Sequence, residues 1–458
     1  MSKQIRLQAA ATLAVILILA AVLPCGFVAG TQAQSVAVAS TRDARNAAVV
    51  EATAAVLKET SELRELPILR PVKSGTQSRD EIQRFLIKNM DEDTSVADLH
   101  ASEVFLKKLG LVPADFQFRP FIISLLTEQV AGYYDPKQQE FFLADWIDLD
   151  GQQPVMAHEL THALQDQHFN LRRFEKWPKG DADAELAAHA LVEGDASLAM
   201  AHYVARNPLR ILSLLKSIGD PKSATEEIDR APRAIRESLL FPYDQGMQWT
   251  QALHRRSGWP LVSKAYKDLP QSTEQILHAE KYFAHEAPLK VALPNIASTL
   301  GVGWKRIDTD VNGEWGYYLI LDEYLKSAQE SKRAAAGWGG DRYAVYEGSK
   351  PGEVVIVQVS VWDDAHEAME FFDAYKKRTE KRYAGATPIR NPYTDFETKW
   401  QEGQTWRTKE GLVFVIRNSD RVVIVEGLPE GTNLKKLEGL FGRSVGRKKA
   451  SLSSRPVS

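Results

Sequence analysis

A chain of 458 residues, 26% charged and 44% hydrophobic, has the composition of an ordinary globular protein and room for two or three domains. Its formal net charge is -3 and it contains no block of basic residues, so nothing in it favours a nucleic-acid partner. Cys25 is the only cysteine, which excludes a fold held together by disulfide bonds within the chain.

The N-terminus has the layout of a secretory signal peptide. Two basic residues precede an apolar run over residues 9–28, and small residues stand at the −3 and −1 positions of a cut after Ala33. We expect a signal peptide over residues 1–33 and a mature protein, secreted or periplasmic, that begins near Gln34. The alternative is an uncleaved membrane anchor over residues 9–28, because that run is nearly long enough to span a bilayer.

The first half of the chain is predicted to be mainly helical. After a linker at 34–50, helical periodicity appears over residues 51–66, 80–88, 121–130 and 182–203. The stretch "GYYDPKQQEFFL" changes to a β pattern: two short strands flank the turn Asp135-Pro136-Lys137. This predicts a hairpin directly before the next helix, within a first domain at 51–295.

The predicted secondary structure changes from mainly helix to mainly strand after residue 300. Apolar, β-branched runs predict strands at residues 353–362, 411–418 and 421–428, with an amphipathic helix at 363–378 between the first two. We therefore expect a separate α+β domain at 300–445 and a disordered tail at 446–458. The predicted fold class of the whole chain is α+β.

The stretch "VMAHELTHALQDQH", from Val155 to His168, carries the strongest chemical signal. His158 and His162 are four residues apart, so they project from one helix face and can reach one ion at about 2.0–2.1 Å. Glu159 points about 100° away from His158, which suits it to hold a water molecule rather than the ion. The pattern predicts a catalytic metal site.

The third ligand of that site is left open by spacing alone. A catalytic zinc ion keeps three protein ligands and one open position. Glu185, His189 and Glu193 share one face of the helix predicted at 182–203, so each of them is a candidate. Gly194, next to Glu193, would let a neighbouring helix approach closely.

His158-Glu159-Leu160-Thr161-His162, followed by Glu193-Gly194-x-Ala196, resembles the zincin metallopeptidases of the gluzincin type. The stretch "HELTHALQDQH" with a later "EGDA" also resembles a little-characterised set of secreted bacterial and archaeal proteins. The resemblance covers about residues 120–290 and is most specific over 156–197. It implies a zincin-like, mostly helical domain with a small sheet.

The resemblance also implies roles for individual residues. His158, His162 and Glu193 would bind Zn²⁺, and Glu159 would be the general base in hydrolysis of a peptide bond. Thermolysin-like enzymes carry an acidic residue four positions after the ligand glutamate, where this chain has Ser197. Support for His162 must therefore come from elsewhere, and Asp195 is a candidate for it.

A second electrophile is expected to stabilise the oxyanion of the reaction, typically a histidine or tyrosine further along the chain. Four residues qualify by type and position: Tyr243, His254, His278 and Tyr282. We favour Tyr243 or His278. Each of the four could equally be a packed aromatic ring or a histidine with a purely structural partner.

The sequence thus predicts an exported zinc metallopeptidase that acts on a protein or peptide substrate. No nucleic acid is expected as a partner, and membrane contact is expected only if the signal segment stays uncleaved. One alternative is a non-catalytic, zinc-containing binding protein of the cell envelope, in which Glu185 or His189 would complete a closed four-ligand site. A second alternative is a zinc hydrolase that acts on a non-peptide bond of the cell wall.

Overall fold

The computed structural model describes residues 42–146, 149–175, 177, 180–207, 209–210, 230–389, 402–433 and 436–437. The predicted signal peptide or anchor and the predicted tail lie outside the described residues. Within the described part, no helix combines the length and the apolar character needed to cross a bilayer.

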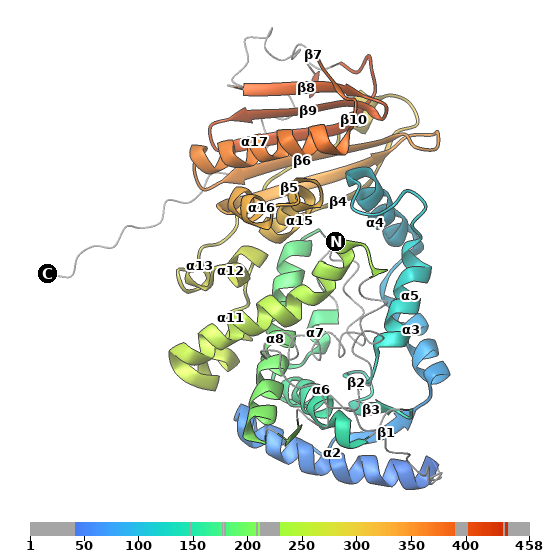
Figure 1. Cartoon of the computed structure of the whole chain (residues 1–458), viewed down its shortest axis with the longest axis vertical. Helices are drawn as coiled ribbons and strands as arrows, with labels where there is room; N and C mark the ends of the chain where they lie inside the picture. The colour runs from blue at the N-terminus through green and yellow to red at the C-terminus, as the bar shows by residue number, and fades with distance from the viewer. Residues whose placement is uncertain are drawn as a thin grey trace, which may run out of the picture.

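The first part of the chain is built mainly from helices that stack into the lower half of an elongated molecule (Figure 1). The helices are α2 (Arg42–Arg64), α3 (Arg79–Asp93), α4 (Val96–Leu109), α5 (Phe118–Gln129), α6 (Leu149–Phe169), α7 (Arg172–Glu175), α8 (Ala182–Arg206), α11 (Arg233–Ala265), α12 (Thr273–Leu277) and α13 (Ala279–Phe283). Helices α6 and α8 are buried along most of their length, with apolar side chains all around α8. Such helices belong to the interior of a protein, where they can hold polar groups away from water.

A small sheet lies beside α6. Its strands are β1 (Lys73–Gln77), β2 (Gly132–Asp135) and β3 (Glu140–Ala144), in the order β1-β3-β2. Strands β2 and β3 form the antiparallel hairpin predicted from the sequence, which places β2 at the edge of the sheet. Strand β1 pairs with β3 in parallel, and this pairing was not predicted because "KSGTQ" lacks an alternating apolar pattern.

The second part of the chain forms a sheet in the order β4-β5-β6-β10-β9-β8-β7, with neighbouring strands antiparallel. The strands are β4 (Lys305–Asp310), β5 (Trp338–Glu347), β6 (Val354–Trp362), β7 (Thr387–Ile389), β8 (Glu402–Thr408), β9 (Gly411–Asn418) and β10 (Arg421–Leu428). Helices α15 (Gly313–Leu325), α16 (Ala328–Ala335) and α17 (Ala365–Arg382) lie together, and α17 crosses one face of the sheet (Figure 1). The prediction of an α+β chain, mainly helical first and with a sheet domain behind it, is confirmed.

The opposite face of this sheet is covered by the chain that enters the domain. Val291, Ile296 and Leu300, the last in α14 (Ala297–Leu300), pack against side chains of β5, β6, β9 and β10. Both faces are therefore buried, and this explains why the predicted strands are near-continuous apolar runs rather than alternating ones.

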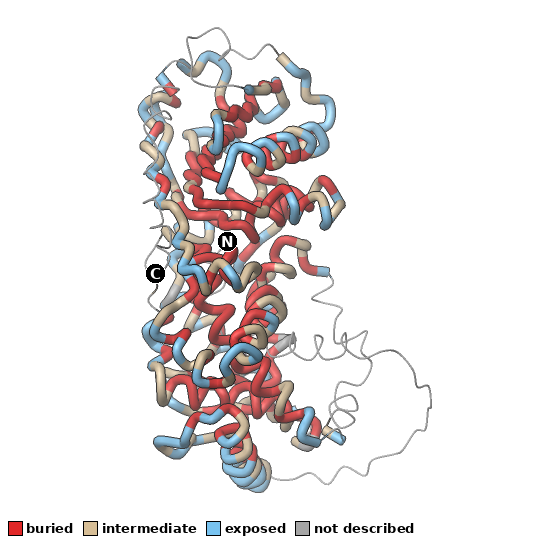
Figure 2. Tube along the Cα trace, turned by 90° about the vertical axis from the view of Figure 1, so that its left-hand side faces the viewer, coloured by how far each residue is buried: buried red, intermediate tan, exposed pale blue. Residues whose placement is uncertain are grey.

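The two parts share one apolar core. Buried side chains of both belong to a single cluster, and a continuous buried zone runs along the molecule (Figure 2). At the junction, the backbone N–H of Ala182 donates to Asp310 of β4, and Arg378 of α17 donates to the carbonyl of Leu109 in α4. The sheet domain is thus packed firmly onto α4 and α8.

One boundary predicted from the sequence is wrong. Residues 34–50 were expected to be a linker, but α2 begins at Arg42. The reason lies in tertiary packing: Val49, Val56 and Leu57 are buried against α6 and the small sheet, and this stabilises a helix that local composition alone does not predict.

Candidate metal centre

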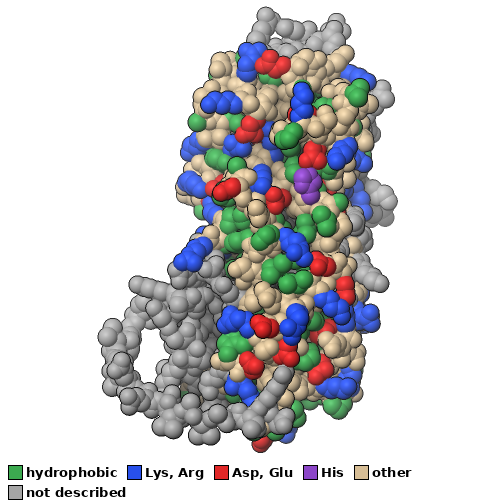
Figure 3. Space-filling view, turned by 90° about the vertical axis from the view of Figure 1, so that its right-hand side faces the viewer, with side chains coloured by type: hydrophobic (Ala, Val, Ile, Leu, Met, Phe, Trp, Pro, Cys, Tyr) green, Lys and Arg blue, Asp and Glu red, His purple; other side chains and the backbone are tan. Residues whose placement is uncertain are grey.

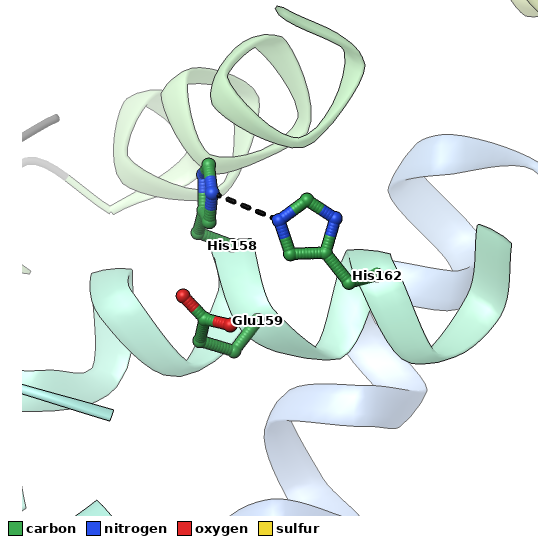
Figure 4. Close-up of side chains that lie close together, drawn as sticks. All are labelled: His158, Glu159 and His162. Atoms are coloured by element: carbon green, nitrogen blue, oxygen red, sulfur yellow. Dashed lines mark hydrogen bonds between the residues drawn. The ribbon is translucent and has the colours of Figure 1, made fainter. Parts of the chain in front are cut away.

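Helix α6 holds the two histidines in the interior of the molecule. Six apolar residues around the motif are fully buried: Val155, Met156, Ala157, Leu160, Ala163 and Leu164. Most of them pack against α2 and β3. His158 and His162 are only 1% and 9% exposed, and their imidazoles lie on the same side of α6 (Figure 4).

Three ligand atoms from two helices converge here. Nε2 of His158 lies 3.2 Å from Nε2 of His162, and Oε2 of Glu193 in α8 lies 3.2 Å and 3.3 Å from these two nitrogens. Glu185 and His189 are also buried in α8, but they stand two turns and one turn earlier, about 12 Å and 6 Å along the helix axis. The position of Glu193 therefore matches the third ligand implied by the resemblance.

The close crossing of α8 and α11 brings Glu193 to this place. A Cβ atom on Gly194 would lie 2.2 Å from the backbone of Gly246 in α11, and a Cβ atom on Gly246 would lie 2.2 Å from the carbonyl oxygen of Ala190. Both positions therefore require glycine. The approach of a neighbouring helix predicted at Gly194 is present, and the neighbour is α11.

The spacing of the three atoms fits a tetrahedral zinc ion. Bonds of 2.0–2.1 Å at tetrahedral angles separate neighbouring ligand atoms by about 3.3–3.4 Å. The observed separations of 3.2–3.3 Å between Nε2 of His158, Nε2 of His162 and Oε2 of Glu193 are close to this value. Two imidazoles and one carboxylate are also the ligand types that zinc takes in hydrolytic sites.

Charge supports the same conclusion. Burial alone would lower the pKa of His162, but the Glu193 carboxylate outweighs burial and raises the pKa to about 9. Burial alone would raise the pKa of Glu193, but His162 and His158 hold it well below its usual range. Each partner thus stabilises the charged form of the other, and a bound cation would take over the positive charge that His162 provides.

Glu159 lies beside the pair of imidazoles rather than between them (Figure 4). The residue is 5% exposed, and its carboxylate lies within 4.8 Å of a ring nitrogen of each histidine. The backbone N–H of Tyr134 in β2 donates to Oε2 of Glu159 at 3.0 Å. The edge strand of the small sheet therefore fixes the position of this carboxylate.

Tyr243 of α11, one of the two favoured oxyanion candidates, lies next to His158. Its ring is stacked on that of His158, with 5.9 Å between the ring centroids. Burial, together with the carboxylates of Glu193 and Glu159, raises the pKa of the Tyr243 hydroxyl well above its usual value. The phenol keeps its proton at any physiological pH and can donate a hydrogen bond.

The contacts of His278 lie elsewhere. Its Nε2 is 2.9 Å from Glu314 in α15, and this carboxylate raises the pKa of His278. The α12 segment that leads to it is attached to the first turn of α8, where Thr273 donates to Asp183, ten residues before Glu193. Ten residues of helix span about 15 Å, so the structure groups His278 with the domain junction and not with the metal centre.

The two other aromatic candidates also have partners outside the centre. The ring of His254 packs against His202 and Trp259, and the hydroxyl of Tyr282 donates to the carbonyl of Asp268. Of the four candidates, the structure brings Tyr243 alone into contact with a ligand side chain among the described residues.

Gln165 is a site residue that the sequence analysis missed. Its Oε1 lies 2.9 Å from Nδ1 of His162, and its Nε2 lies 3.0 Å from Oδ2 of Asp195. Asp195, the suggested support for His162, is therefore one side chain removed from it. Position i+3 of the same helix was the signal that could have identified Gln165, because side chains three residues apart are neighbours on a helix.

A second acidic group is present in the described residues, at the junction of the two parts. Carboxylate oxygens of Glu274, Glu286 and Asp363 lie within 4.8 Å of one another. The amine of Lys281 already lies among them, at 2.6, 3.1 and 2.7 Å respectively. The place that a cation would take among these carboxylates is already occupied by the lysine amine, so this group differs in kind from the cluster at His158.

Comparison with known proteins concerns the second part of the chain only. A family model described as "Domain of unknown function (DUF8575)" matches residues 299–438, from α14 to the end of the sheet domain. No curated protein and no solved structure matches the chain.

Proposed function

We propose that this chain is an exported zinc-dependent metallopeptidase of the zincin type. One observation carries the proposal: the convergence of Nε2 of His158, Nε2 of His162 and Oε2 of Glu193 at mutual distances of 3.2–3.3 Å in the interior of the molecule. Burying such groups together costs free energy unless a cation compensates them.

Each residue of the cluster has its own role in the proposed hydrolysis. His158, His162 and Glu193 would hold Zn²⁺, and the bound ion would supply Lewis acidity for the scissile carbonyl and for water. Glu159 accepts the proton of the attacking water and passes it to the leaving amine, a step typically worth 10²–10⁴-fold. The hydrogen bond from the backbone N–H of Tyr134 keeps the Glu159 carboxylate in place for both transfers.

Tyr243 is the residue we assign to the oxyanion. Its hydroxyl remains protonated because burial and the neighbouring carboxylates raise its pKa. A neutral donor fixed beside the reacting carbonyl stabilises the negative charge that develops on the oxygen during attack. His278 is not included in this proposal because its ring is engaged with Glu314.

A peptide is the substrate class that the surroundings of Glu159 favour. Strand β2 is at the edge of its sheet and contacts Glu159 through the backbone of Tyr134. An extended peptide can add to a sheet edge by main-chain hydrogen bonds, which would bring a scissile bond alongside Glu159. This favours a peptide over a cell-wall bond that lacks such a backbone.

The location and partners that we propose rest on the sequence. We place the mature protein outside the cytoplasm, secreted or periplasmic, with membrane contact only if residues 9–28 are retained. N-terminal sequencing of the exported protein distinguishes a cleaved signal peptide from a retained anchor.

On the face that carries α3, α4 and α5, positive and negative side chains are interspersed (Figure 3). That face has no single-sign field of the kind that attracts nucleic acid.

The test compares the wild type with Glu159→Gln. Zinc content is measured by elemental analysis, and cleavage is measured with casein and a peptide library. We expect about one zinc per chain in both proteins, an unchanged melting temperature, and hydrolysis reduced by ~10²–10⁴-fold in the variant. Absence of a transition metal from the metal-replete wild type contradicts the zinc site, and equal turnover in the two zinc-loaded proteins contradicts the role of Glu159.

A further inference from the structure

A series of fully buried polar side chains, joined by hydrogen bonds, connects the end of α2 to the candidate metal centre. Arg64 of α2, Asp195 of α8 and Gln165 of α6 are each 0% exposed. They are joined by hydrogen bonds in this order, and the last bond reaches Nδ1 of His162. Polar groups at this depth are costly unless each bond is made, so the direction of each hydrogen bond is constrained.

We propose that Asp195 is a positioning residue that acts through the Gln165 amide. It keeps the proton of His162 on Nδ1 and directs the Nε2 lone pair towards His158 and Glu193. This inference rests on the proposed zinc site, since the lone pair matters only if Nε2 binds a metal.

The orientation of the Gln165 amide follows from its neighbours. Its nitrogen lies 3.0 Å from the carbonyl oxygen of Val192 and 3.0 Å from Oδ2 of Asp195. Both of these oxygens are acceptors, so the NH₂ end of the amide must face them. The carbonyl end, Oε1, therefore faces Nδ1 of His162 at 2.9 Å. An amide oxygen accepts only, so Nδ1 must be the ring nitrogen that carries hydrogen.

Asp195 is held as an acceptor by three other donors. Nε and Nη2 of Arg64 lie 2.5 Å and 3.1 Å from its two oxygens, and the hydroxyl of Tyr266 donates to Oδ2 at 2.8 Å. With these donors in place, Asp195 offers only lone pairs to Gln165. The guanidinium of Arg64 is fixed in turn by the ring of Trp259, at 4.5 Å, and by Ser263. This buried ion pair therefore sets the donor and acceptor direction of each hydrogen bond between Arg64 and His162.

The other histidine of the motif, His158, lacks such support. Nδ1 of His158 is buried and has no hydrogen-bond partner in the described part of the chain. The Asp195–Gln165 pair is therefore the arrangement that orients a ligand ring in this centre. It also makes α2 part of the working protein, since removal of α2 would leave the buried carboxylate of Asp195 without Arg64.

Two substitutions at one position test the proposal. Gln165→Met keeps the approximate volume but removes both hydrogen-bonding ends. Gln165→Glu keeps an oxygen for the Nδ1 hydrogen, and its other oxygen can share a proton with Asp195, since two adjacent carboxyls do not both ionise. Both variants leave the Arg64–Asp195 pair intact.

The measurement is Zn²⁺ affinity of the full chain by competition with a chelator, together with the melting temperature of the metal-free protein. We expect Gln165→Met to weaken zinc binding by ~10–100-fold, the usual effect of losing a residue that supports a metal ligand. Gln165→Glu should bind zinc at least several-fold more tightly than Gln165→Met. Equal zinc affinities of the two variants overturn the proposal, whatever their melting temperatures, because a merely structural role predicts no difference between them.

Asp195→Asn supplies an independent arm. The new amide has the same shape but can donate, so the Gln165 amide is free to reverse and to offer NH₂ to Nδ1 of His162. We expect zinc affinity to fall by ~10–100-fold in this variant too. If loss of the Arg64 partner prevents folding, the two Gln165 variants decide alone. A wild type that binds no zinc sinks the proposed function itself, whereas a zinc-binding wild type with unaffected Gln165→Met sinks only the role of Asp195 and Gln165.

Discussion

Glu426 in the sheet domain and Glu193 in the helical part are both buried carboxylates, but their surroundings differ. Glu426 accepts hydrogen bonds from Tyr375, Arg378 and Tyr383. Burial would raise its pKa, yet Arg378 and the two tyrosines hold the pKa below its usual value. Its charge is neutralised and both oxygens are satisfied by donors, which is the pattern of a structural ion pair.

Glu193 faces two imidazole rings instead. Its Oε2 lies 3.2 Å and 3.3 Å from two imidazole nitrogens, which themselves lie 3.2 Å apart. Three atoms with lone pairs point at a common centre, and the charge balance there needs a proton or a cation. Burial of a charge is therefore common to both carboxylates; the convergence of three possible ligand atoms on one point distinguishes Glu193 from Glu426. Four substitutions break or sharpen this comparison.

The largest effect is expected at the acceptor cluster. Glu193→Gln removes the negative charge, so we expect zinc affinity to fall by more than the roughly 10–100-fold that loss of a supporting residue costs, and hydrolysis to be lost with the metal. Zinc stoichiometry and competition with a chelator measure this. Glu185→Gln, on the same helix, is the matched control and should keep its zinc; the reverse result would show that the third ligand was assigned wrongly.

The corresponding substitution in the sheet domain should act on stability alone. Glu426→Gln leaves Arg378 as an uncompensated buried charge, so the free energy of unfolding should fall by about 3–5 kcal/mol while zinc affinity stays unchanged. Denaturant unfolding measures it. Glu402→Gln is the control, because the Glu402 side chain is 49% exposed beside Arg417 and such pairs contribute about 0–1 kcal/mol. A change in zinc affinity for Glu426→Gln would show that the two parts are not independent in this respect.

Tyr243→Phe should separate catalysis from metal binding. Loss of an oxyanion donor typically lowers kcat by ~10²–10³-fold, and neither zinc content nor melting temperature should change. Steady-state kinetics on the best library peptide provide the measurement. His278→Gln serves as the comparison and should leave kcat near the wild-type value; a larger loss in His278→Gln than in Tyr243→Phe would reverse the assignment.

The smallest effect concerns the helix crossing that positions Glu193. The methyl group of Gly194→Ala would lie 2.2 Å from the Gly246 backbone, so we expect overpacking to cost about 1–3 kcal/mol of stability and to weaken zinc binding. Gly75→Ala is the control, because its methyl group would meet nothing within 4 Å. Thermal melts with and without zinc measure both quantities, and equal behaviour of the two variants would show that the crossing can relax without disturbing Glu193.

The sequence alone determined those features that depend on local periodicity. The spacing of His158 and His162 places them on one face of any helix, and the apolar flanks place that helix in the interior. The hairpin before the motif and the strands of the sheet domain follow from β-branched runs and turn residues. These patterns repeat every 2 or 3.6 residues, so they can be read without knowing where the rest of the chain lies.

The tertiary structure alone decided which distant residues meet. Glu185, His189 and Glu193 share one helix face, and the selection of Glu193 depends on where α8 crosses α6 and α11. Arg64 reaches Asp195 across 131 positions of sequence, and His278 is drawn to Glu314 of the other domain. Such contacts are set by how whole helices pack and by the need to pair buried charges, and neither leaves a periodic trace in the sequence.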